Sequence, residues 1–287
     1  MINSKAIKIK SEELEIPFAN ILSGYVVETA VALVATTAYG KDMWLCNYRD
    51  LGIDVYKKKP SLTLIYRYQG REPLADFCTG LCADLKVRYQ QEGFILKEIR
   101  QEQRGRGIGI QLELLLEEKY IPLTLEVEQS ASTHLFPKEE TFRLLMENNK
   151  TVELKLYPME QMVANHLAKI IQQLELLNDM EHYIELYDML KQYPLEGRKV
   201  RDELVHICED QHIATDNKAY ALWATYGDYT FMKKKWKVLL RREKRREPQW
   251  QEAFHLIEKF FHPIWQAICK EEIFFGDWMP EIERFLE

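Results

Sequence analysis

Two neighbouring stretches decide the fold: YPMEQMVANHLA at residues 157–168 and HYIELYDM at residues 182–189. The first is centred on alanines and indicates a helix over residues 158–177, and the second indicates a helix over residues 181–192. Helical spacing recurs downstream, so almost everything after about residue 136 is expected to be helical. The other expected helices cover residues 196–212, 217–226, 233–246 and 248–269, with a last short helix at 277–286.

Upstream of these stretches the chain is a mixture of helical and β-rich segments. Leu123, Leu125 and Val127 alternate with polar residues, which is typical of a strand with one buried face. Helices are expected at residues 12–38 and 71–91, and strands at 43–48, 62–68, 94–102, 108–117 and 121–128.

These patterns predict an α+β protein with two domains. A mixed domain is expected over residues 1–150 and a helical domain over residues 151–287, with the border within residues 140–152.

The composition is that of a globular chain outside the membrane. It has 287 residues, 46% of them apolar, and a formal net charge of −6, which argues against coating nucleic acid by bulk charge but allows a local basic groove. The most apolar run, residues 21–38, is interrupted by Glu28 and by hydroxyl residues, and the N-terminus lacks a signal-peptide pattern. The five cysteines include Cys78 and Cys82 on one helical face, without a second pair at metal spacing. We expect buried apolar cysteines in a cytoplasmic protein.

The two opening stretches resemble the helical half of the AbiEii/AbiGii toxins, a nucleotidyltransferase family. In that family a strand ends at a proline, the next helix reads Glu-x-x-x-Ala-x-Lys-Leu, and a second helix reads Arg-x-x-Asp-Leu-Tyr-Asp-Leu. Here Pro158, Glu160 and Ala164 match the first motif, and residues 185–189, Glu-Leu-Tyr-Asp-Met, match the second. The resemblance implies a nucleotidyltransferase-like mixed sheet with flanking helices, transfer of a nucleotide to RNA or another target, and a separate antitoxin partner.

Nucleotidyl transfer needs two carboxylates at alternate positions of one strand and a third on a neighbouring strand, so that together they hold Mg²⁺. A small Gly-Gly or Gly-Ser turn lets the triphosphate approach the backbone. The alignment to the family puts Asn47 and Tyr48 at the two small positions, Ser61 at the serine of the metal motif, and Thr63 and Ile65 at its two carboxylates. Asn47, Ser61 and Thr63 are thus degenerate nucleotide-binding positions.

A second alignment puts residues 49–54 on the metal motif instead. It leaves Asp54 as one aspartate, with Gly52 in place of its partner, and makes Asp54 and Glu126 the alternative metal ligands.

Three other residues stand at site positions of the family. Glu126 is at the third-strand carboxylate, Asp188 is in the Tyr-Asp motif, and His166 replaces a lysine that would bind phosphate. Alternative interpretations are a solvated strand face for Glu126 and a helix–helix polar contact for Asp188. Because one carboxylate cannot replace two around Mg²⁺, the residues favour a catalytically degenerate member that acts as a binding or assembly module in bacterial defence. The alternative is an active enzyme that uses Mg²⁺ and a nucleoside triphosphate, with Asp54 or Asp50, Glu126 and Asp188.

A basic stretch supplies a third hypothesis, a nucleic-acid-binding protein. Its cations are either a solvated helix face or a local patch for RNA, DNA or an acidic partner, and Arg100, Arg104 and Arg106 could extend the patch. The histidines are not expected to cluster into a metal site, and the late aromatic residues are expected to pack between helices. The candidate patch consists of Lys233, Lys234, Lys235, Arg241, Arg242, Arg245 and Arg246.

Overall fold

The computed structural model describes residues 3–58, 60–104, 107–130, 135–146, 150–176 and 180–286. The chain divides into two compact units, of which the first extends to Tyr157 and the second begins at Pro158. Each unit has its own core, and each is described separately below.

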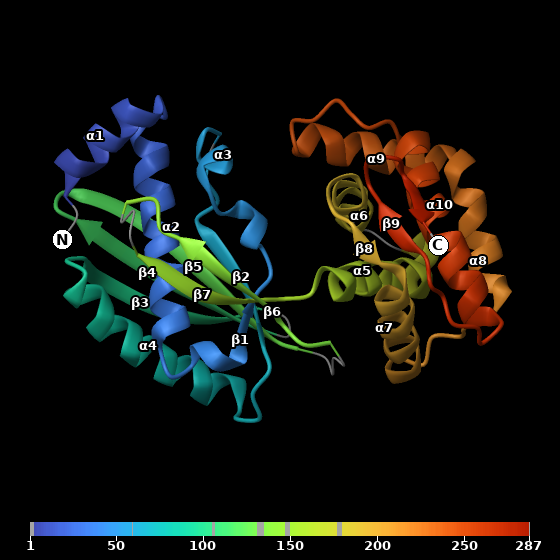
Figure 1. Ribbon diagram of the computed structural model, residues 1–287, viewed down its shortest axis with the longest axis horizontal. Coiled ribbons are helices and arrows are strands. Elements are labelled where there is room, and N and C mark those ends of the chain that lie inside the picture. Colours follow the sequence, from blue (N-terminus) through green and yellow to red (C-terminus); the bar gives the residue numbers. More distant parts are fainter. Residues whose placement is uncertain are drawn as a thin grey trace. The chain divides into compact units, whose positions relative to one another are not determined.

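A seven-stranded mixed sheet forms the centre of the first unit (Figure 1). The strand order is β3-β4-β5-β2-β1-β7-β6. Strand β2 is antiparallel to β1 and parallel to β5, and β1 is parallel to β7. The strands are β1 (Met43–Leu45), β2 (Thr63–Tyr68), β3 (Ile95–Arg104), β4 (Gly107–Leu116), β5 (Lys119–Gln129), β6 (Lys138–Arg143) and β7 (Thr151–Leu156).

Helices α2 (Phe18–Thr36) and α4 (Leu74–Gln91) cover one face of this sheet (Figure 1). Helix α2 is long and apolar enough to cross a bilayer, and 72% of that window is buried inside the unit, where α2 is the central core helix. The prediction of one helix over residues 12–38 was wrong at its start. The chain instead forms α1 (Ser4–Leu14) and then α2, because Glu15 takes a left-handed conformation and Pro17 stands directly before α2.

Helix α2 also carries a buried carboxylate, Glu28, whose side chain ties three segments together. It accepts hydrogen bonds from the Tyr56 hydroxyl at 2.8 Å and from the Leu145 backbone N–H at 2.6 Å. Tyr56 belongs to the short helix α3 (Ile53–Tyr56), and its ring packs against Gly24, where an added Cβ would lie 2.9 Å from the ring. Burial raises the pKa of Glu28 to about 7.

The prediction that almost everything after residue 136 is helical was wrong for the hairpin of β6 and β7. In β7 the buried residues Val152, Leu154 and Leu156 alternate with outward-facing ones, which is the same period-two pattern that had identified β5. The hairpin belongs to the first unit, so the boundary between the units falls after Tyr157 rather than within residues 140–152.

The second unit is mainly helical. The prediction of a last helix over residues 277–286 was wrong, because this segment forms a hairpin that pairs with β8 and buries Trp278 completely. The expected α+β class, with a mixed sheet, flanking helices and a helical C-terminal region, is confirmed. The elements are α5 (Met159–Gln173), α6 (Glu181–Gln192), β8 (Leu195–Glu196), α7 (Gly197–Asp210), α8 (Asn217–Ala224), α9 (Thr230–Arg242), α10 (Trp250–Cys269), β9 (Asp277–Met279) and β10 (Arg284–Leu286), with short 3₁₀ turns at Leu174–Leu176 and Thr225–Asp228.

Tryptophans dominate the core of the second unit, as the aromatic spacing predicts. Trp223, Trp236, Trp250, Trp265 and Trp278 are each at most 2% exposed. Every one of these indole N–H groups donates a hydrogen bond, to the Tyr183 hydroxyl or to a backbone carbonyl. The cysteines are unpaired; four of them are buried, as expected, and Cys269 is partly exposed.

Candidate functional site

Asn47, Ser61 and Thr63, which the alignment predicts to be degenerate nucleotide-binding positions, lie together between β1 and the start of β2. The Asn47 amide donates to the Thr63 carbonyl at 2.8 Å and to Asp50 at 3.0 Å, and its oxygen accepts from the Ile65 N–H at 2.8 Å. The Thr63 N–H in turn donates to Ser61 Oγ at 3.2 Å. Both amide hydrogens of Asn47 are therefore engaged within the protein, and the side chain extends the pairing of β1 with β2.

Glu126 stands on β5 beside Thr63 and Ile65, the two positions at which the alignment to the family expects carboxylates. The parallel register of β2 and β5 pairs Ile65 with Glu126 and Thr63 with Thr124. Because successive side chains of a strand point to opposite faces, Thr63, Ile65 and Glu126 share the sheet face opposite to Leu64 and Leu125, which are fully buried. We call this face of the two strands β2 and β5, which α2 and α4 do not cover, the open face.

An arginine balances the charge of Glu126. Arg104, at the end of β3, donates to Glu126 at 3.0 Å and also pairs with Glu102 at 3.2 Å. Its side chain crosses β4 at Gly109, where an added Cβ would lie 2.9 Å from Arg104 Nε. Gly109 pairs with Glu102 on one side and Glu126 on the other, so the glycine provides the space for this crossing.

The next carboxylate on the open face is also neutralised. Glu128 follows Glu126 on the same side of β5 and forms an ion pair with Arg67, its register partner on β2. The open face thus presents two carboxylates, and an arginine binds each. Within the described part of the chain no group of three or more His, Cys, Asp or Glu side chains could hold a metal ion.

The second alignment requires Asp54 to lie on a strand, but it does not. It is on helix α3, its side chain is 94% exposed, and it binds Lys57 at 2.8 Å. The hydrogen bond from Lys57 lowers the pKa of Asp54. The second alignment, in which Asp54 and Glu126 are the metal ligands, is therefore corrected. The chain turns into a helix at Gly52, so no strand register connects Asp54 with Glu126.

Asp188, in the second unit, is held by an arginine in the same way as Glu126. Arg245 donates to both carboxylate oxygens, at 2.7 and 2.9 Å, and this hydrogen bonding raises the pKa of Arg245. The pair connects α6 to the segment that follows α9. A bidentate arginine of this kind fixes both oxygens of the carboxylate.

His166 has partners at both ring nitrogens. Its Nδ1 lies 2.9 Å from Nδ1 of His182, and its Nε2 lies 3.1 Å from Glu185. His182 and Glu185 stand one turn apart on α6 and face His166 on α5. The sequence analysis did not predict this contact, because the packing of α5 on α6 brings together two histidines that are far apart in the sequence.

In the basic stretch, which covers α9 and the residues after it, some cations bind other side chains of the protein and four of the described ones form no ion pair. Arg242 pairs with Glu181 and Glu243, Arg245 binds Asp188, and Lys235 lies 4.5 Å from the Phe231 ring centroid. Among the residues that the structure describes, no ion pair forms at Lys233, Lys234, Arg241 or Arg246.

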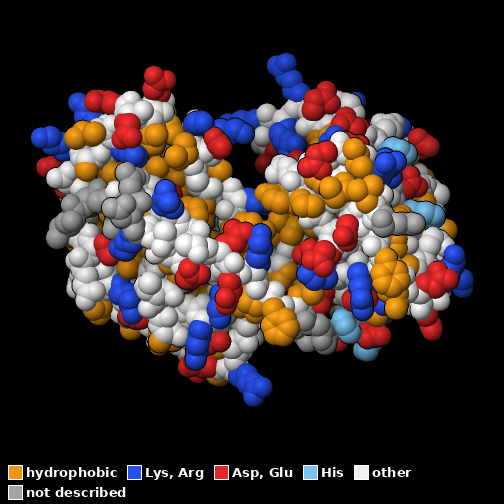
Figure 2. Space-filling model, in the orientation of Figure 1, with side chains coloured by type: hydrophobic (Ala, Val, Ile, Leu, Met, Phe, Trp, Pro, Cys, Tyr) orange, Lys and Arg blue, Asp and Glu red, His pale blue; other side chains and the backbone are white. Residues whose placement is uncertain are grey.

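The expected extension of this patch at the sheet edge consists of paired charges. Arg100 binds Glu98 at 2.5 Å and Arg104 binds Glu126, while Arg106 lies outside the described residues. On the face shown in Figure 2, Lys and Arg side chains are intermingled with Asp and Glu.

No protein-family model and no curated protein matches the chain. Two solved structures from Helicobacter pylori are similar to it. One, JHP933, shares 13% identity and a TM-score of 0.42, over 89% of this chain and 94% of that one. The other is described as a "putative nucleotidyltransferase from H. pylori" and shares 12% identity and a TM-score of 0.44, over 88% of this chain and 95% of that one. These are distant structural similarities, and membership in the AbiEii/AbiGii family stays a prediction.

Proposed function

We propose that the chain is a catalytically degenerate nucleotidyltransferase-like protein that acts as a binding or assembly module, in a bacterial defence or toxin–antitoxin setting. One observation supports the loss of catalysis: Glu126 is paired with Arg104 at 3.0 Å. It lies next to Ile65 and Thr63, which stand at the two positions where metal binding would need carboxylates. A guanidinium bound to the remaining carboxylate competes with Mg²⁺ for the same oxygens. The module role and its setting rest on the motif resemblance at residues 157–189.

Calorimetry with Mg²⁺ and each nucleoside triphosphate tests the loss of catalysis. We expect no micromolar binding, because neither Thr63 nor Ile65 can supply the charge that balances a divalent ion. Clear Mg²⁺-dependent binding by the wild-type chain would contradict the proposal.

A gain-of-function variant tests whether the missing carboxylates are the reason. Thr63→Asp with Ile65→Asp and Arg104→Gln should bind Mg²⁺ where the wild-type chain does not, since three carboxylates would then meet on the open face. The matched control is Thr141→Asp with Arg143→Asp, which adds two aspartates at alternate exposed positions of β6. Equal Mg²⁺ binding by both variants would mean that added charge, and not this site, is responsible.

An active metal-dependent nucleotidyltransferase is the alternative. It rests on the family resemblance, which puts Glu126 and Asp188 at carboxylate positions of the site. In that case Glu126→Ala and Asp188→Ala should each abolish the transfer of label from a radiolabelled nucleotide to RNA. Unchanged transfer in both variants would discard these residues as catalytic groups.

Nucleic-acid binding is supported by the cations of the basic stretch that have no ion pair. Charge reversal at Lys234, Arg241 and Arg246 should remove salt-sensitive binding of RNA or DNA, because phosphate contacts dominate such binding. The control reverses three other exposed cations of the second unit, Lys218, Lys259 and Lys270. Equal binding by the two triple variants would discard the basic stretch as the interface.

A further inference from the structure

The seven-stranded sheet ends on one side at β3, which has no strand on its outer side among the described residues. This edge strand is long, because β3 spans Ile95–Arg104, whereas β6 at the opposite edge spans Lys138–Arg143. Residues 100–104 of β3 are all exposed. An exposed edge of this kind presents a row of backbone N–H and C=O groups to which another strand can be added.

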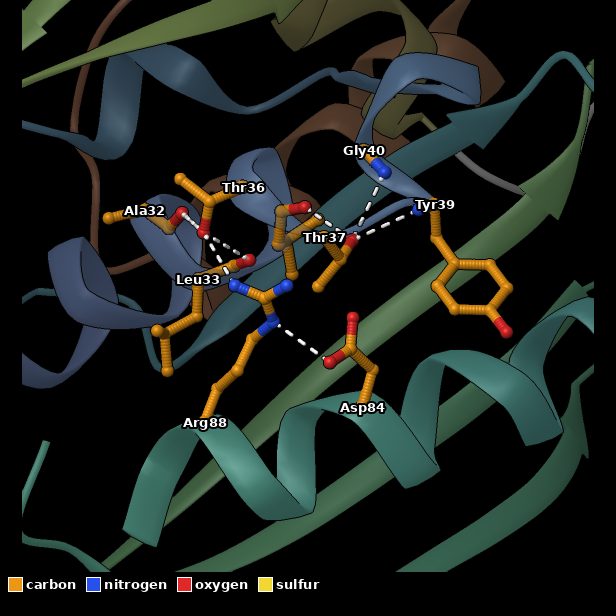
Figure 3. Close-up of polar contacts among 9 residues, drawn as sticks. Ala32, Leu33, Thr36, Thr37, Tyr39, Gly40, Asp84 and Arg88 are labelled. Carbon is orange, nitrogen blue, oxygen red and sulfur yellow. Dashed lines mark hydrogen bonds and ion pairs between the residues drawn. The ribbon is translucent and has the colours of Figure 1, made fainter. Parts of the chain in front are cut away.

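Helix α4 packs on the face of the sheet next to β3 and leaves the edge itself accessible. The Gln101 amide of β3 donates to Cys82 Sγ of α4 at 3.5 Å. Toward α2, Arg88 of α4 binds Asp84 at 2.9 Å and donates to the Thr36 hydroxyl at 3.4 Å (Figure 3). The helix is therefore held between β3 and α2, over the face of the sheet, and a strand can approach β3 in the plane of the sheet.

The charges on one side of β3 alternate in sign. Successive residues of a strand point to opposite faces, so every second residue of β3 lies on the side where Arg104 binds Glu126. The hydrogen bond from Arg100 lowers the pKa of Glu98, so this carboxyl is ionised at neutral pH. After the irregularity between Leu96 and Glu98, the residues on this side, which we call the charged row, are Glu98, Arg100, Glu102 and Arg104.

The charged row is complementary to itself when two copies run antiparallel. If Gln101 lies opposite Gln101 of a second copy, then Glu98 lies opposite Arg104 and Arg100 lies opposite Glu102, each of them twice. A shift of two residues puts either Arg100 or Glu102 opposite its own copy, where like charges repel. A shift of one residue moves the charged row of one copy to the other face. Only the register centred on Gln101 therefore pairs all four charges favourably.

The ion pairs that the charged row forms within the chain do not prevent this pairing. Arg100 binds Glu98 and Arg104 binds Glu102, and the four side chains are each at least 40% exposed. Exposed ion pairs contribute little to stability, so an exchange of partners is cheap. An arginine also has five N–H donors, so it can bind a carboxylate of a second copy and keep its own.

We propose that β3 pairs antiparallel with β3 of a second copy of this chain, in the register centred on Gln101, so that the two sheets become continuous. The charged rows then form four ion pairs between the copies, two from Glu98 to Arg104 and two from Arg100 to Glu102. A pairing of two strands buries little surface, so the dimer is reversible and weak. The inference goes beyond the proposed function, because the pairing needs neither nucleotide nor Mg²⁺ and is independent of the calorimetric result.

Charge exchange within the pair tests the register. In sedimentation equilibrium over a series of concentrations, the wild-type chain should show a reversible equilibrium of monomer and dimer. Arg100→Glu and Glu102→Arg each put two pairs of like charges opposite one another, so each should weaken the dimer about 10- to 50-fold. The double variant pairs opposite charges again and should return to within about threefold of the wild-type affinity. A mixture of the two single variants should form a heterodimer of similar affinity.

Glu140→Arg on β6 is the matched control, because it makes the same change of net charge as Glu102→Arg at the other edge of the sheet. It should leave the dimer unchanged. A wild-type chain that stayed monomeric at the highest attainable concentration would overturn the proposal. So would a double variant as weak as the two single variants, or equal weakening by Glu140→Arg, since the effect would then belong to net charge.

Disulfide formation locates the pairing, in a Cys269→Ser background that removes the one partly exposed cysteine. Chains with Glu98→Cys mixed with chains with Arg104→Cys should form a cross-linked dimer, because opposite residues of an antiparallel pair are close enough for a disulfide. Glu98→Cys alone should not cross-link, since the two cysteines would then be about 20 Å apart. The reverse result would place the contact in another register and overturn the proposal.

Discussion

The side chains on the two faces of the central sheet have different surroundings. Under α2 and α4 the sheet presents a tightly packed apolar surface, to which β2 contributes Leu64, Tyr66 and Tyr68. On the open face the same strand presents Thr63, Ile65 and Arg67, and the carboxylates of β5 are held by arginines. The covered face is constrained by packing, whereas the open face carries the polar residues that the proposed function involves. The comparison shows that one strand, β2, contributes buried apolar side chains to one face and partly exposed ones to the other.

Truncation on the covered face should have the largest effect. Leu64→Ala should lower the free energy of unfolding by about 2–5 kcal/mol, because it leaves a cavity in a fully buried position. Ile65→Ala, one residue away on the open face, is the matched control and should cost clearly less. Urea unfolding of both variants measures the difference, and equal losses would show that the two faces are equally important for stability.

The buried carboxylate of α2 should make stability depend on pH. The pKa of Glu28 is raised by burial from 4.5 to about 7, so the folded chain keeps this proton after the unfolded chain has lost it. Its contribution is therefore fully present below pH 4.5, decreases as pH rises, and is lost above about pH 7. The decrease should amount to at most about 3 kcal/mol.

Glu28→Gln isolates this contribution, since glutamine has nearly the same shape and does not titrate. The difference in unfolding free energy between the wild-type chain and the variant should change between pH 4.5 and 7 and be constant above that range. A difference that does not vary with pH would exclude Glu28 as the titrating group.

The smallest effect is expected from the ion pair of the open face. Arg104→Ala should change the free energy of unfolding by about 0.2–1 kcal/mol, because Glu126 and Arg104 are both partly exposed and water screens their attraction. High salt should reduce the effect further. A loss comparable to that of Leu64→Ala would mean that Arg104 supports the fold rather than only neutralising Glu126.

Much of the fold could be predicted from local patterns. The alternation of Leu123, Leu125 and Val127 identified β5, and Gly93 ends α4 as a glycine at a helix C-terminus does. The errors came from short elements: β6 has little apolar alternation, and the last hairpin depends on burying Trp278 in the second unit.

The site was less predictable, because its contacts are long-range. The positions of Asn47, Thr63 and Glu126 follow from strand order, but the link from Arg104 to Glu126 depends on the missing side chain of Gly109 on the strand between them. Likewise, His166 and His182 meet only because α5 and α6 pack together. A single sequence contains no local signal for either contact.

The distribution of tryptophan gives the protein a built-in optical label. Of its six tryptophans, Trp44 is in the first unit and the other five are buried in the second. Since the emission of an indole shifts to longer wavelength when water reaches it, the fluorescence of the whole chain reports mainly on the second unit. Substituting Trp44 by phenylalanine would confine the signal to that unit, and the difference from circular dichroism would then show whether the two units unfold together.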